Sequence, residues 1–215
     1  MSNSEIKNLI DGSEAIDYVI DWPSNIYGWS LVLHPHPLYG GSRDNKVVTT
    51  ISRECVRQGL ISIRPNFRGV GESSGVFDNG IGETEDMVRL IKHVIELYPY
   101  LLDLPLFISG FSFGSAVAAE LSSRILKDNL GIRIRNLILI GSAVQRFQFS
   151  DLVIPSNTVI IHGEVDEVVA FSEMLDWARP RAIPIIMIPS CSHFFHGKLL
   201  SLRQMVSNCL KSSII

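Results

Sequence analysis

The sequence lacks long apolar runs and clusters of basic residues. No stretch approaches the roughly 18 consecutive apolar residues of a membrane-spanning helix. The chain of 215 residues has a formal net charge of -3 and no run of Lys or Arg long enough for a nucleic-acid arm. Because phosphate neutralisation requires clustered positive charge, we expect no nucleic acid as the main partner. We also expect no membrane partner.

Cysteine is scarce too. The three cysteines, Cys55, Cys191 and Cys209, are odd in number and show neither a CxxC motif nor a metal-ligand spacing. This pattern favours free thiols in a reducing compartment. The first residues, MSNSEIKNLIDGSE, lack the positive and apolar regions of a secretory signal. Together these features predict a cytoplasmic protein.

The chain does contain enough apolar sequence for a core. Hydrophobic residues make up 46% of it and charged residues 19%, which is typical of globular rather than disordered proteins. A chain of 215 residues fits one domain, and no linker, repeat or low-complexity tract divides it. We therefore predict a single domain over residues 1–215.

Short apolar runs alternate with helical patterns along the chain. The expected strands are 30–34, 60–64, 105–109, 136–140, 158–162 and 184–188, with 15–20 as an edge strand. The expected helices are 45–58, 83–97, 113–126, 171–178 and 198–210. Because most of the strand runs are apolar without alternation, they indicate strands that are buried on both faces. The sequence thus predicts an α/β fold with a doubly wound, mostly parallel sheet of about seven strands, helices on both faces and no lid domain.

A serine stands at one expected strand-to-helix turn. Residues 110–114 read G-F-S-F-G. This is a G-x-S-x-G motif that follows an expected strand and leads into an expected helix, which is the setting of a nucleophilic serine. Side chains two residues before or after the serine would clash in so tight a turn, which explains the glycines. We therefore expect Ser112 to be a nucleophile. The alternative is a glycine-rich turn with an idle serine.

A nucleophilic serine requires a base, and the base requires an acid that orients it. The segment GEVDEVV follows the strand expected at 158–162 and offers three carboxylates, Glu164, Asp166 and Glu167. A carboxylate at the end of a strand points into the ligand crevice of an open α/β sheet. For Asp166 the alternative is a helix N-cap role, although it lies rather far upstream of the next helix.

Two histidines follow the last expected strand. A loop at this place can return an imidazole to the nucleophile. His193 leaves the strand first and precedes an apolar pair of residues that can fix the loop. We therefore favour His193 over His196 as the base.

The sequence HPHPLYGG directly follows the strand expected at 30–34. The intermediate of acyl transfer carries an oxyanion that needs two backbone N–H donors. We expect the residue after the nucleophile, Phe113, to supply one. Pro35 and Pro37 have no N–H, so the second donor is His36 or Leu38, and we favour His36.

The same segment allows a metal site. His34 and His36 share a face if the strand continues, and His193, His196 and Asp166 would supply further ligands. The interleaved prolines make a regular pair of strand ligands awkward. We therefore expect no metal and no cofactor.

Several segments resemble a known family. HPHPLYGGSRDNKVV, NFRGVGESSG, GFSFGSA, HGEVDEVV and SHFFHGKL are similar to the compact, lid-less bacterial branch of the α/β-hydrolase superfamily, which is related to dienelactone hydrolases and small esterases. The resemblance implies the α/β-hydrolase fold, with the HGxxD aspartate, Asp166, as the acid and the first histidine of HFFHG, His193, as the base. The chain order Ser112, Asp166, His193 is the order of nucleophile, acid and base in that superfamily.

Four further residues are expected at the substrate pocket: Leu38, Tyr39, Arg43 and Arg68. Arg43 stands where relatives tend to carry an apolar residue. Arg68 belongs to a loop that is mainly structural in the superfamily, because its glycines permit tight turns. Each arginine is expected either to have a structural or surface role or to bind a substrate carboxylate.

These residues predict a serine hydrolase of the carboxylesterase or thioesterase type, whose partner is a small ester or thioester. Peptidase or acyltransferase chemistry would use the same three residues. Two alternatives belong to other classes. One is a catalytically silent binding module on a hydrolase scaffold, since fold does not fix function. The other is a metal-dependent hydrolase built on His34 and His36.

Overall fold

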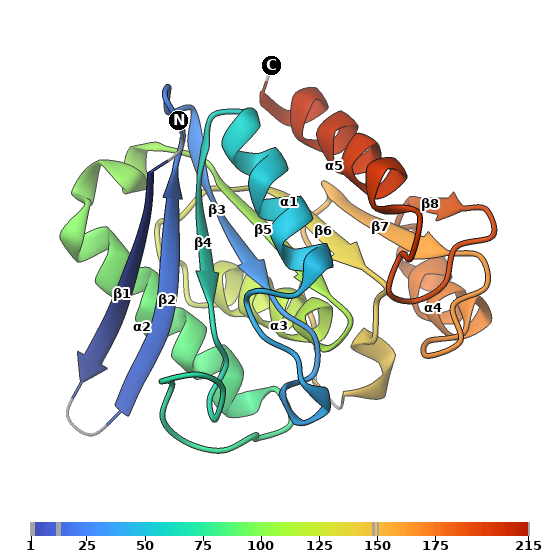
Figure 1. Ribbon diagram of the computed structural model, residues 1–215, viewed down its shortest axis with the longest axis horizontal. Coiled ribbons are helices and arrows are strands. Elements are labelled where there is room, and N and C mark those ends of the chain that lie inside the picture. Colours follow the sequence, from blue (N-terminus) through green and yellow to red (C-terminus); the bar gives the residue numbers. More distant parts are fainter. Residues whose placement is uncertain (1–2, 12–13, 148, 150, 215) are drawn as a thin grey trace.

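The computed structural model describes residues 3–11, 14–147, 149 and 151–214. Over these residues the chain forms one eight-stranded sheet with helices on both faces (Figure 1). The strands are β1 (Asn3–Asp11), β2 (Glu14–Trp22), β3 (Gly28–Leu33), β4 (Leu60–Pro65), β5 (Leu106–Phe111), β6 (Ile134–Ile140), β7 (Thr158–Gly163) and β8 (Ile185–Ile188). The helices are α1 (Lys46–Arg57), α2 (Ile81–Leu97), α3 (Phe113–Lys127), α4 (Phe171–Ala178) and α5 (Leu199–Ile214).

The strand order is β1-β2-β4-β3-β5-β6-β7-β8. All pairs from β4 to β8 are parallel, while β1 pairs with β2 and β2 with β4 in antiparallel orientation. This confirms the doubly wound, mostly parallel sheet that the sequence predicts.

The N-terminal part of the sheet differs from the prediction. The segment expected as an edge strand, 15–20, lies in β2, which is an inner strand because β1 pairs along its other side. The sheet therefore has one strand more than expected. The sequence of β1, NSEIKNLID, contains no continuous apolar run. An antiparallel edge strand does not need one, since only one of its sides is paired within the sheet and one of its faces can contact water.

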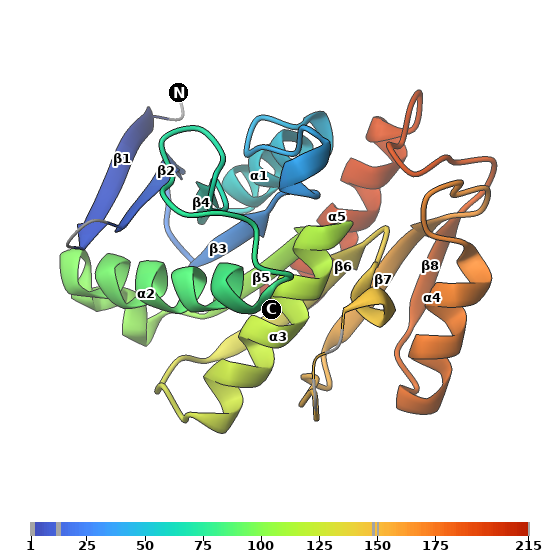
Figure 2. The same cartoon turned by 90° about the horizontal axis from the view of Figure 1, so that it is seen from below.

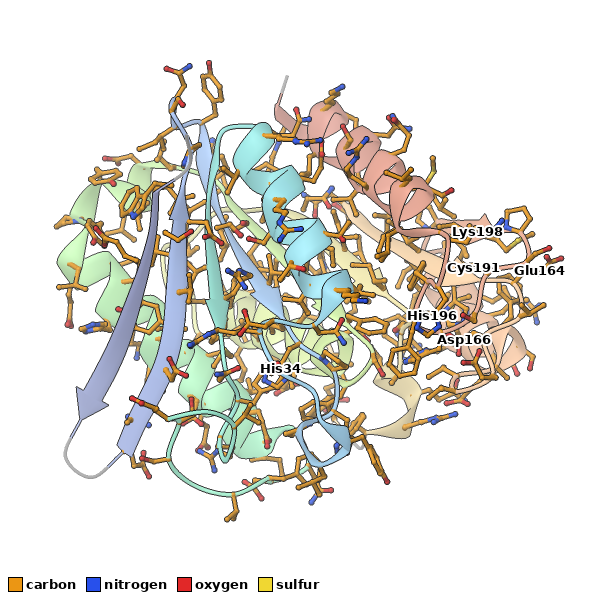
Figure 3. All side chains as sticks on the ribbon, in the orientation of Figure 1. His34, Glu164, Asp166, Cys191, His196 and Lys198 are labelled. Carbon is orange, nitrogen blue, oxygen red and sulfur yellow. The ribbon has the colours of Figure 1, made fainter. Side chains whose placement is uncertain are left out.

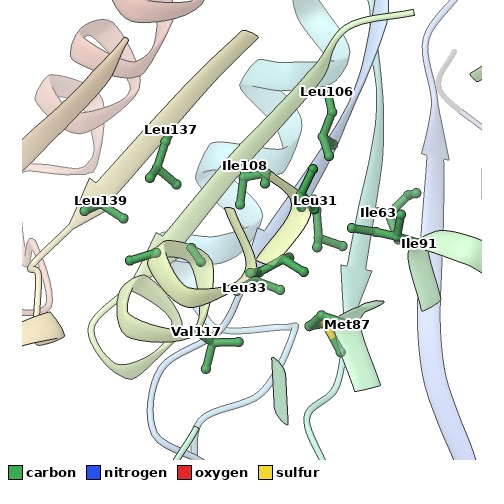
Figure 4. Close-up of a cluster of buried hydrophobic side chains, with 14 of the residues drawn as sticks. Leu31, Leu33, Ile63, Met87, Ile91, Leu106, Ile108, Val117, Leu137 and Leu139 are labelled. Atoms are coloured by element: carbon green, nitrogen blue, oxygen red, sulfur yellow. The ribbon is translucent and has the colours of Figure 1, made fainter. Parts of the chain in front are cut away.

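The sheet divides the core into two parts. Helices α1 and α5 cover one face of the sheet, and α2, α3 and α4 cover the other (Figure 2). On the second face, Met87 and Ile91 of α2 and Val117 of α3 pack against leucine and isoleucine side chains of the central strands (Figure 4). Burial on both faces explains why these strands are continuously apolar in sequence.

Local signals set the helix boundaries. Helix α1 begins at Lys46 because the side-chain oxygen of Asn45 accepts the backbone N–H of Val47 at 2.9 Å. Helix α2 begins two residues before the expected start, at Ile81. The carboxylate of Glu83 reaches back to the backbone N–H of Gly80 at 2.8 Å and caps the helix there.

Because the strands from β4 to β8 in the sheet order are parallel, they all end at the same edge of the sheet. The loops after β3, β5, β7 and β8 therefore meet there. Among the residues described, none of the helices is both long and apolar enough to cross a membrane.

Candidate active site

The turn between β5 and α3 places Ser112 in a strained backbone conformation, with φ 54° and ψ -120°. A Cβ atom on Gly110 would overlap the carbonyl oxygen of Gly114. A Cβ atom on Gly114 would lie 2.5 Å from the carbonyl oxygen of Leu33. Only glycine fits either position, as the G-x-S-x-G pattern predicts. The backbone N–H of Ser112 donates to the carbonyl of Ile140 at 2.8 Å, which ties the turn to β6.

Three side chains from separate loops meet above this turn. The Oγ atom of Ser112 lies 3.0 Å from Nε2 of His193, and Nδ1 of His193 lies 2.7 Å from Oδ2 of Asp166. All three residues are buried. A carboxylate only accepts hydrogen bonds, so Nδ1 of His193 carries a proton and Nε2 is free to accept from the serine hydroxyl. This is the arrangement of a nucleophile, a base and an orienting acid.

Two backbone N–H groups and the rings of His193 and His162 surround the carboxylate of Asp166. Its Oδ1 accepts the backbone N–H of Val168 at 2.9 Å and that of Val169 at 2.7 Å. Burial raises the pKa of Asp166, but hydrogen bonds from His193 and Val169 together with the nearby His162 outweigh burial and lower it below its usual value. Asp166 is therefore ionised and fixed in place.

The other carboxylates of this segment have different partners. Glu164 accepts the backbone N–H of Ser190 at 2.7 Å, and Glu167 accepts the backbone N–H of His193 at 3.1 Å. Both hold the loop after β8 by its main chain, while Asp166 alone of the three bonds to the imidazole ring. The competing histidine, His196, is exposed to solvent and lies in a turn just before α5.

The loop after β8 is held by the two phenylalanines that follow His193. The side chain of Phe195 is fully buried. The ring of Phe194 lies edge-on to the imidazole of His193 at 5.1 Å, and Phe111 of β5 packs on the imidazole from 5.0 Å. The apolar pair therefore helps to fix His193, as the sequence suggests.

The backbone N–H groups of Phe113, at the start of α3, and of His36 have no acceptor among the residues described. The N–H of Leu38, by contrast, donates to Nδ1 of His36 at 3.3 Å, and the Leu38 side chain points to solvent. The carbonyl of His36 accepts from the backbone N–H groups of Tyr39 and Gly41, which fixes this loop. Of these two candidate donors, the N–H of Leu38 is thus already used within the loop, whereas that of His36 has no acceptor among the described residues.

A cavity of about 200 Å³ lies directly beside the serine hydroxyl. Besides Ser112, it is lined by Pro35, His36, Tyr39, Gly40, Gly41, Asn45, Val168, His193 and Phe194. No charged Asp, Glu, Lys or Arg side chain belongs to this lining. A larger groove of about 500 Å³ lies between α1 and the β1–β2 hairpin. Its lining includes none of Ser112, Asp166 and His193. Ser112 and His193 therefore face the smaller cavity.

Of the four residues expected at a substrate pocket, the structure brings only Tyr39 to the cavity. Leu38 is 68% exposed on the outside of its turn. Arg43 forms an ion pair with Asp17. Arg68 donates to both carboxylate oxygens of Asp86, at 2.9 and 3.0 Å. Leu38, Arg43 and Arg68 thus do not line this cavity, and the pairing of both guanidinium groups with buried carboxylates agrees with the structural alternative for the arginines.

Several residues that line the cavity are not predicted from the sequence. Gly40 and Gly41 stood in the segment HPHPLYGG, and Asn45 was visible only as a helix cap. Phe194 was interpreted as an anchor of the loop. Val168 carried no signal, because its position depends on how the turn after β7 folds against the loop after β3.

His34 is not available to a metal. Its ring is fully buried, its Nδ1 lies 2.6 Å from the carbonyl of Pro35, and its Nε2 accepts the backbone N–H of Phe67 at 2.8 Å. Burial lowers the pKa of His34 to about 4. Within the described part of the chain, no group of three or more His, Cys, Asp or Glu side chains is placed to hold a metal ion. The described residues therefore give no geometric support to the alternative of a metal site on His34 and His36.

His34 instead braces the site. Figure 3 shows its side chain and that of Asp166 toward the edge at which the parallel strands end. Because His34 bonds to both Pro35 and Phe67, it joins the loop after β3 to the loop after β4.

The cysteines supply no competing nucleophile. None of the three forms a disulfide, and all three are buried. Burial raises the pKa of each thiol, that of Cys55 to about 12. Since the thiolate is the reactive form, none of them is activated.

Comparisons with known proteins agree with this geometry. The sequence matches no family model. An uncharacterized protein of Rickettsia prowazekii is 33% identical over 177 residues, which cover 79% of this chain and 72% of the relative. The crystal structure of a Xanthomonas campestris protein, a member of the α/β serine hydrolases without a lid, has a TM-score of 0.87 and 31% identity, and covers 97% of this chain and 94% of that one. The structure of an α/β serine hydrolase homologue from Coxiella burnetii has a TM-score of 0.82 and 31% identity, with 98% of each chain covered.

Proposed function

Because the chain belongs to the lid-less branch of the α/β serine hydrolases, we propose that it cleaves small carboxylic esters or thioesters through an acyl-enzyme. One observation carries the proposal: the continuous hydrogen-bonded path from the Ser112 hydroxyl through His193 to Asp166, with distances of 3.0 and 2.7 Å. An inert binding module has no need of this path or of a serine with a φ of 54°.

In the first step, Ser112 Oγ attacks the carbonyl carbon of the substrate while Nε2 of His193 takes the hydroxyl proton. Asp166 holds Nδ1–H and stabilises the imidazolium that forms. The N–H groups of Phe113 and His36 donate to the oxyanion of the tetrahedral intermediate. The imidazolium then gives its proton to the departing alcohol or thiol as the C–O or C–S bond breaks. Ser112 is left as an ester of the acyl group.

In the second step, water replaces the leaving group. Nε2 of His193 takes a proton from the water, whose oxygen attacks the acyl carbon, and the same two N–H groups stabilise the second oxyanion. Collapse of this intermediate returns the proton to Ser112 Oγ and releases the carboxylic acid. Apart from the substrate and this water molecule, the mechanism uses only groups of the chain.

The cavity favours a short, uncharged acyl group. Its volume of about 200 Å³ is below the roughly 300–1,000 Å³ of typical ligand pockets. Since no charged side chain other than the proposed base, His193, lines it, a substrate carboxylate would lose its hydration there without a cationic partner. Tyr39 and Phe194 are 87% and 42% exposed at its rim. They offer apolar contact to a part of the substrate that extends toward solvent.

The test is the intact mass of the protein after treatment with a fluorophosphonate, which phosphonylates activated serines. We expect one adduct on wild type that is unaffected by a chelator and is absent from Ser112→Ala. Ser122→Ala is a matched control, because Ser122 is a buried serine of the same helix that bonds only to the carbonyl of Ala119. It should be labelled like wild type. A folded wild type that gains no adduct would overturn the proposal, and an adduct would justify kinetic assays on panels of esters and thioesters.

A further inference from the structure

His162 is a buried histidine beside the three proposed catalytic residues, and the mechanism above does not use it. It is the penultimate residue of β7, and its side chain is fully buried. Its Nε2 lies 2.9 Å from the carbonyl oxygen of Val169 and 3.4 Å from Oδ2 of Asp166. Its Nδ1 is buried and has no hydrogen-bond partner within the described residues.

These neighbours define the protonation state of the ring. A carbonyl oxygen and an ionised carboxylate both only accept hydrogen bonds, so Nε2 of His162 must carry a proton. Burial lowers the pKa of His162, which leaves Nδ1 unprotonated and the ring neutral at neutral pH. The ring therefore has one N–H, and that N–H faces Val169 and Asp166.

An unpartnered buried nitrogen destabilises a folded protein and requires an explanation. An apolar side chain of similar size would avoid this cost. The ring must therefore contribute through its other nitrogen. The peptide groups of Val169 are held from two sides, because its N–H donates to Oδ1 of Asp166 at 2.7 Å while its carbonyl accepts from His162.

We propose that His162 is a positioning residue for Asp166: its Nε2–H fixes the turn 166–169 through Val169 and places the positive end of the N–H dipole 3.4 Å from Oδ2, the oxygen that His193 uses. This inference rests on the proposed function, since it assigns His162 a part in orienting the base. His162 contacts neither Ser112 nor the cavity and is not itself a catalytic residue.

The proposal predicts the direction of a change in pH dependence. The charged or titratable groups that act on His162 are Asp166 on its own turn, His193 on the loop after β8 and Glu173 on α4. The positive end of the Nε2–H dipole, 3.4 Å from Oδ2 of Asp166, partly offsets the negative charge that the carboxylate presents to His193. Loss of this N–H therefore stabilises the imidazolium of His193 and moves the acidic limb of kcat/KM to higher pH.

Three substitutions separate this role from simple packing. His162→Gln places an amide N–H near the position of Nε2, His162→Asn places it near Nδ1, and His162→Leu removes it. We expect the Asn and Leu variants to lose about tenfold in kcat with little change in KM, and to show the shifted acidic limb. His162→Gln should retain most of kcat and the wild-type limb. His196→Gln, a substitution of an exposed histidine in the loop after β8, serves as the control.

Each measurement is made after circular dichroism has shown a folded variant, and after wild type has been labelled by the fluorophosphonate. If wild type is not labelled, the proposed function fails before this inference is tested. If wild type is labelled and the three variants share its kcat and its acidic limb, His162 has no positioning role. If kcat falls equally in all three variants, including His162→Gln, and the acidic limb of kcat/KM does not move, His162 has a packing role. That result would also overturn the inference.

Discussion

The backbone N–H of His193 donates to the carboxylate of Glu167 at 3.1 Å, while the ring of the same histidine bonds to the neighbouring Asp166. Two consecutive acidic residues thus hold one histidine by its main chain and by its side chain. The first contact places the loop and the second orients the ring.

The main-chain contact can be tested separately from the ring contact. Glu167→Ala removes a charged acceptor, so we expect kcat to fall about threefold to tenfold, a loss that reflects a hydrogen bond to a charged group. Glu167→Gln retains an acceptor oxygen and should lie close to wild type. Glu96→Ala, a substitution of an exposed carboxylate on α2, controls for the change in net charge. Wild-type kcat in Glu167→Ala would show that the loop keeps its place without this bond.

The turn that carries Ser112 should tolerate no side chain at Gly114. A Cβ atom there would lie 2.5 Å from backbone carbonyl oxygens of Leu33 and His34, which cannot move without displacing β3. We expect Gly114→Ala to lower the free energy of unfolding by about 3 kcal/mol and to abolish labelling. Denaturant titration measures the first effect.

The matched control for that variant is Gly131→Ala. Gly131 has a φ of +72° but open space around its missing Cβ. The Gly131→Ala variant therefore reports the cost of backbone strain without a clash. We expect its free energy of unfolding to fall by about 1 kcal/mol. Equal losses in the two variants would contradict the explanation by close approach.

His34 should make stability depend on pH. Burial lowers its pKa from an ordinary value of 6.5 to about 4 in the folded protein. Between these two values the unfolded chain binds a proton at His34 and the folded protein does not, so acid favours unfolding by about 1.4 kcal/mol per pH unit. The stability that the neutral ring contributes is fully present above pH 6.5 and is lost progressively down to about pH 4.

The measurement compares denaturant unfolding of wild type and His34→Gln at about pH 7 and about pH 5. From the higher to the lower pH, the free energy of unfolding should decrease by about 2 kcal/mol more in wild type than in His34→Gln. Nuclear magnetic resonance of the His34 ring provides a second reading that does not depend on the variant folding. A ring that titrates near its ordinary pKa would refute the prediction.

The lining of the cavity predicts discrimination by charge. A 4-nitrophenyl ester of butyric acid and the corresponding monoester of succinic acid differ chiefly by a terminal carboxylate. We expect kcat/KM to be at least about tenfold higher for the butyrate, because the carboxylate would be desolvated without a cation. Equal or better turnover of the succinate would indicate that a cationic side chain reaches the substrate after all.

Local patterns in the sequence were sufficient for much of the fold. The bounds of α4 agree residue by residue with the expected helix at 171–178, and the strand, turn and helix around Ser112 follow from the glycine spacing. These features depend on neighbours in the chain. The strand β1 was missed because pairing at an edge requires no apolar pattern in sequence.

The remaining differences concern contacts between distant segments. The carboxylate partner of Arg68 lies 18 residues away on a helix, and the partner of Arg43 lies 26 residues away on β2. Nothing in the local sequence shows that these arginines are already paired. Val168 reaches the cavity only because the turn after β7 packs beside the loop after β3. Such placements follow from tertiary packing, which a periodic pattern does not encode.

The cavity beside Ser112 is bounded by Tyr39 and Phe194, both of which are in contact with solvent. An acyl group on the proposed nucleophile would therefore be exposed to bulk water from the moment the alcohol or thiol departs. Its lifetime would be governed by how quickly His193 aligns a water molecule, with no preceding step in which a cover must open. Water at its bulk concentration would then outcompete dilute alcohols or amines for the acyl group. An arrangement of this kind favours hydrolysis over transfer and gives rapid turnover without a slow conformational phase.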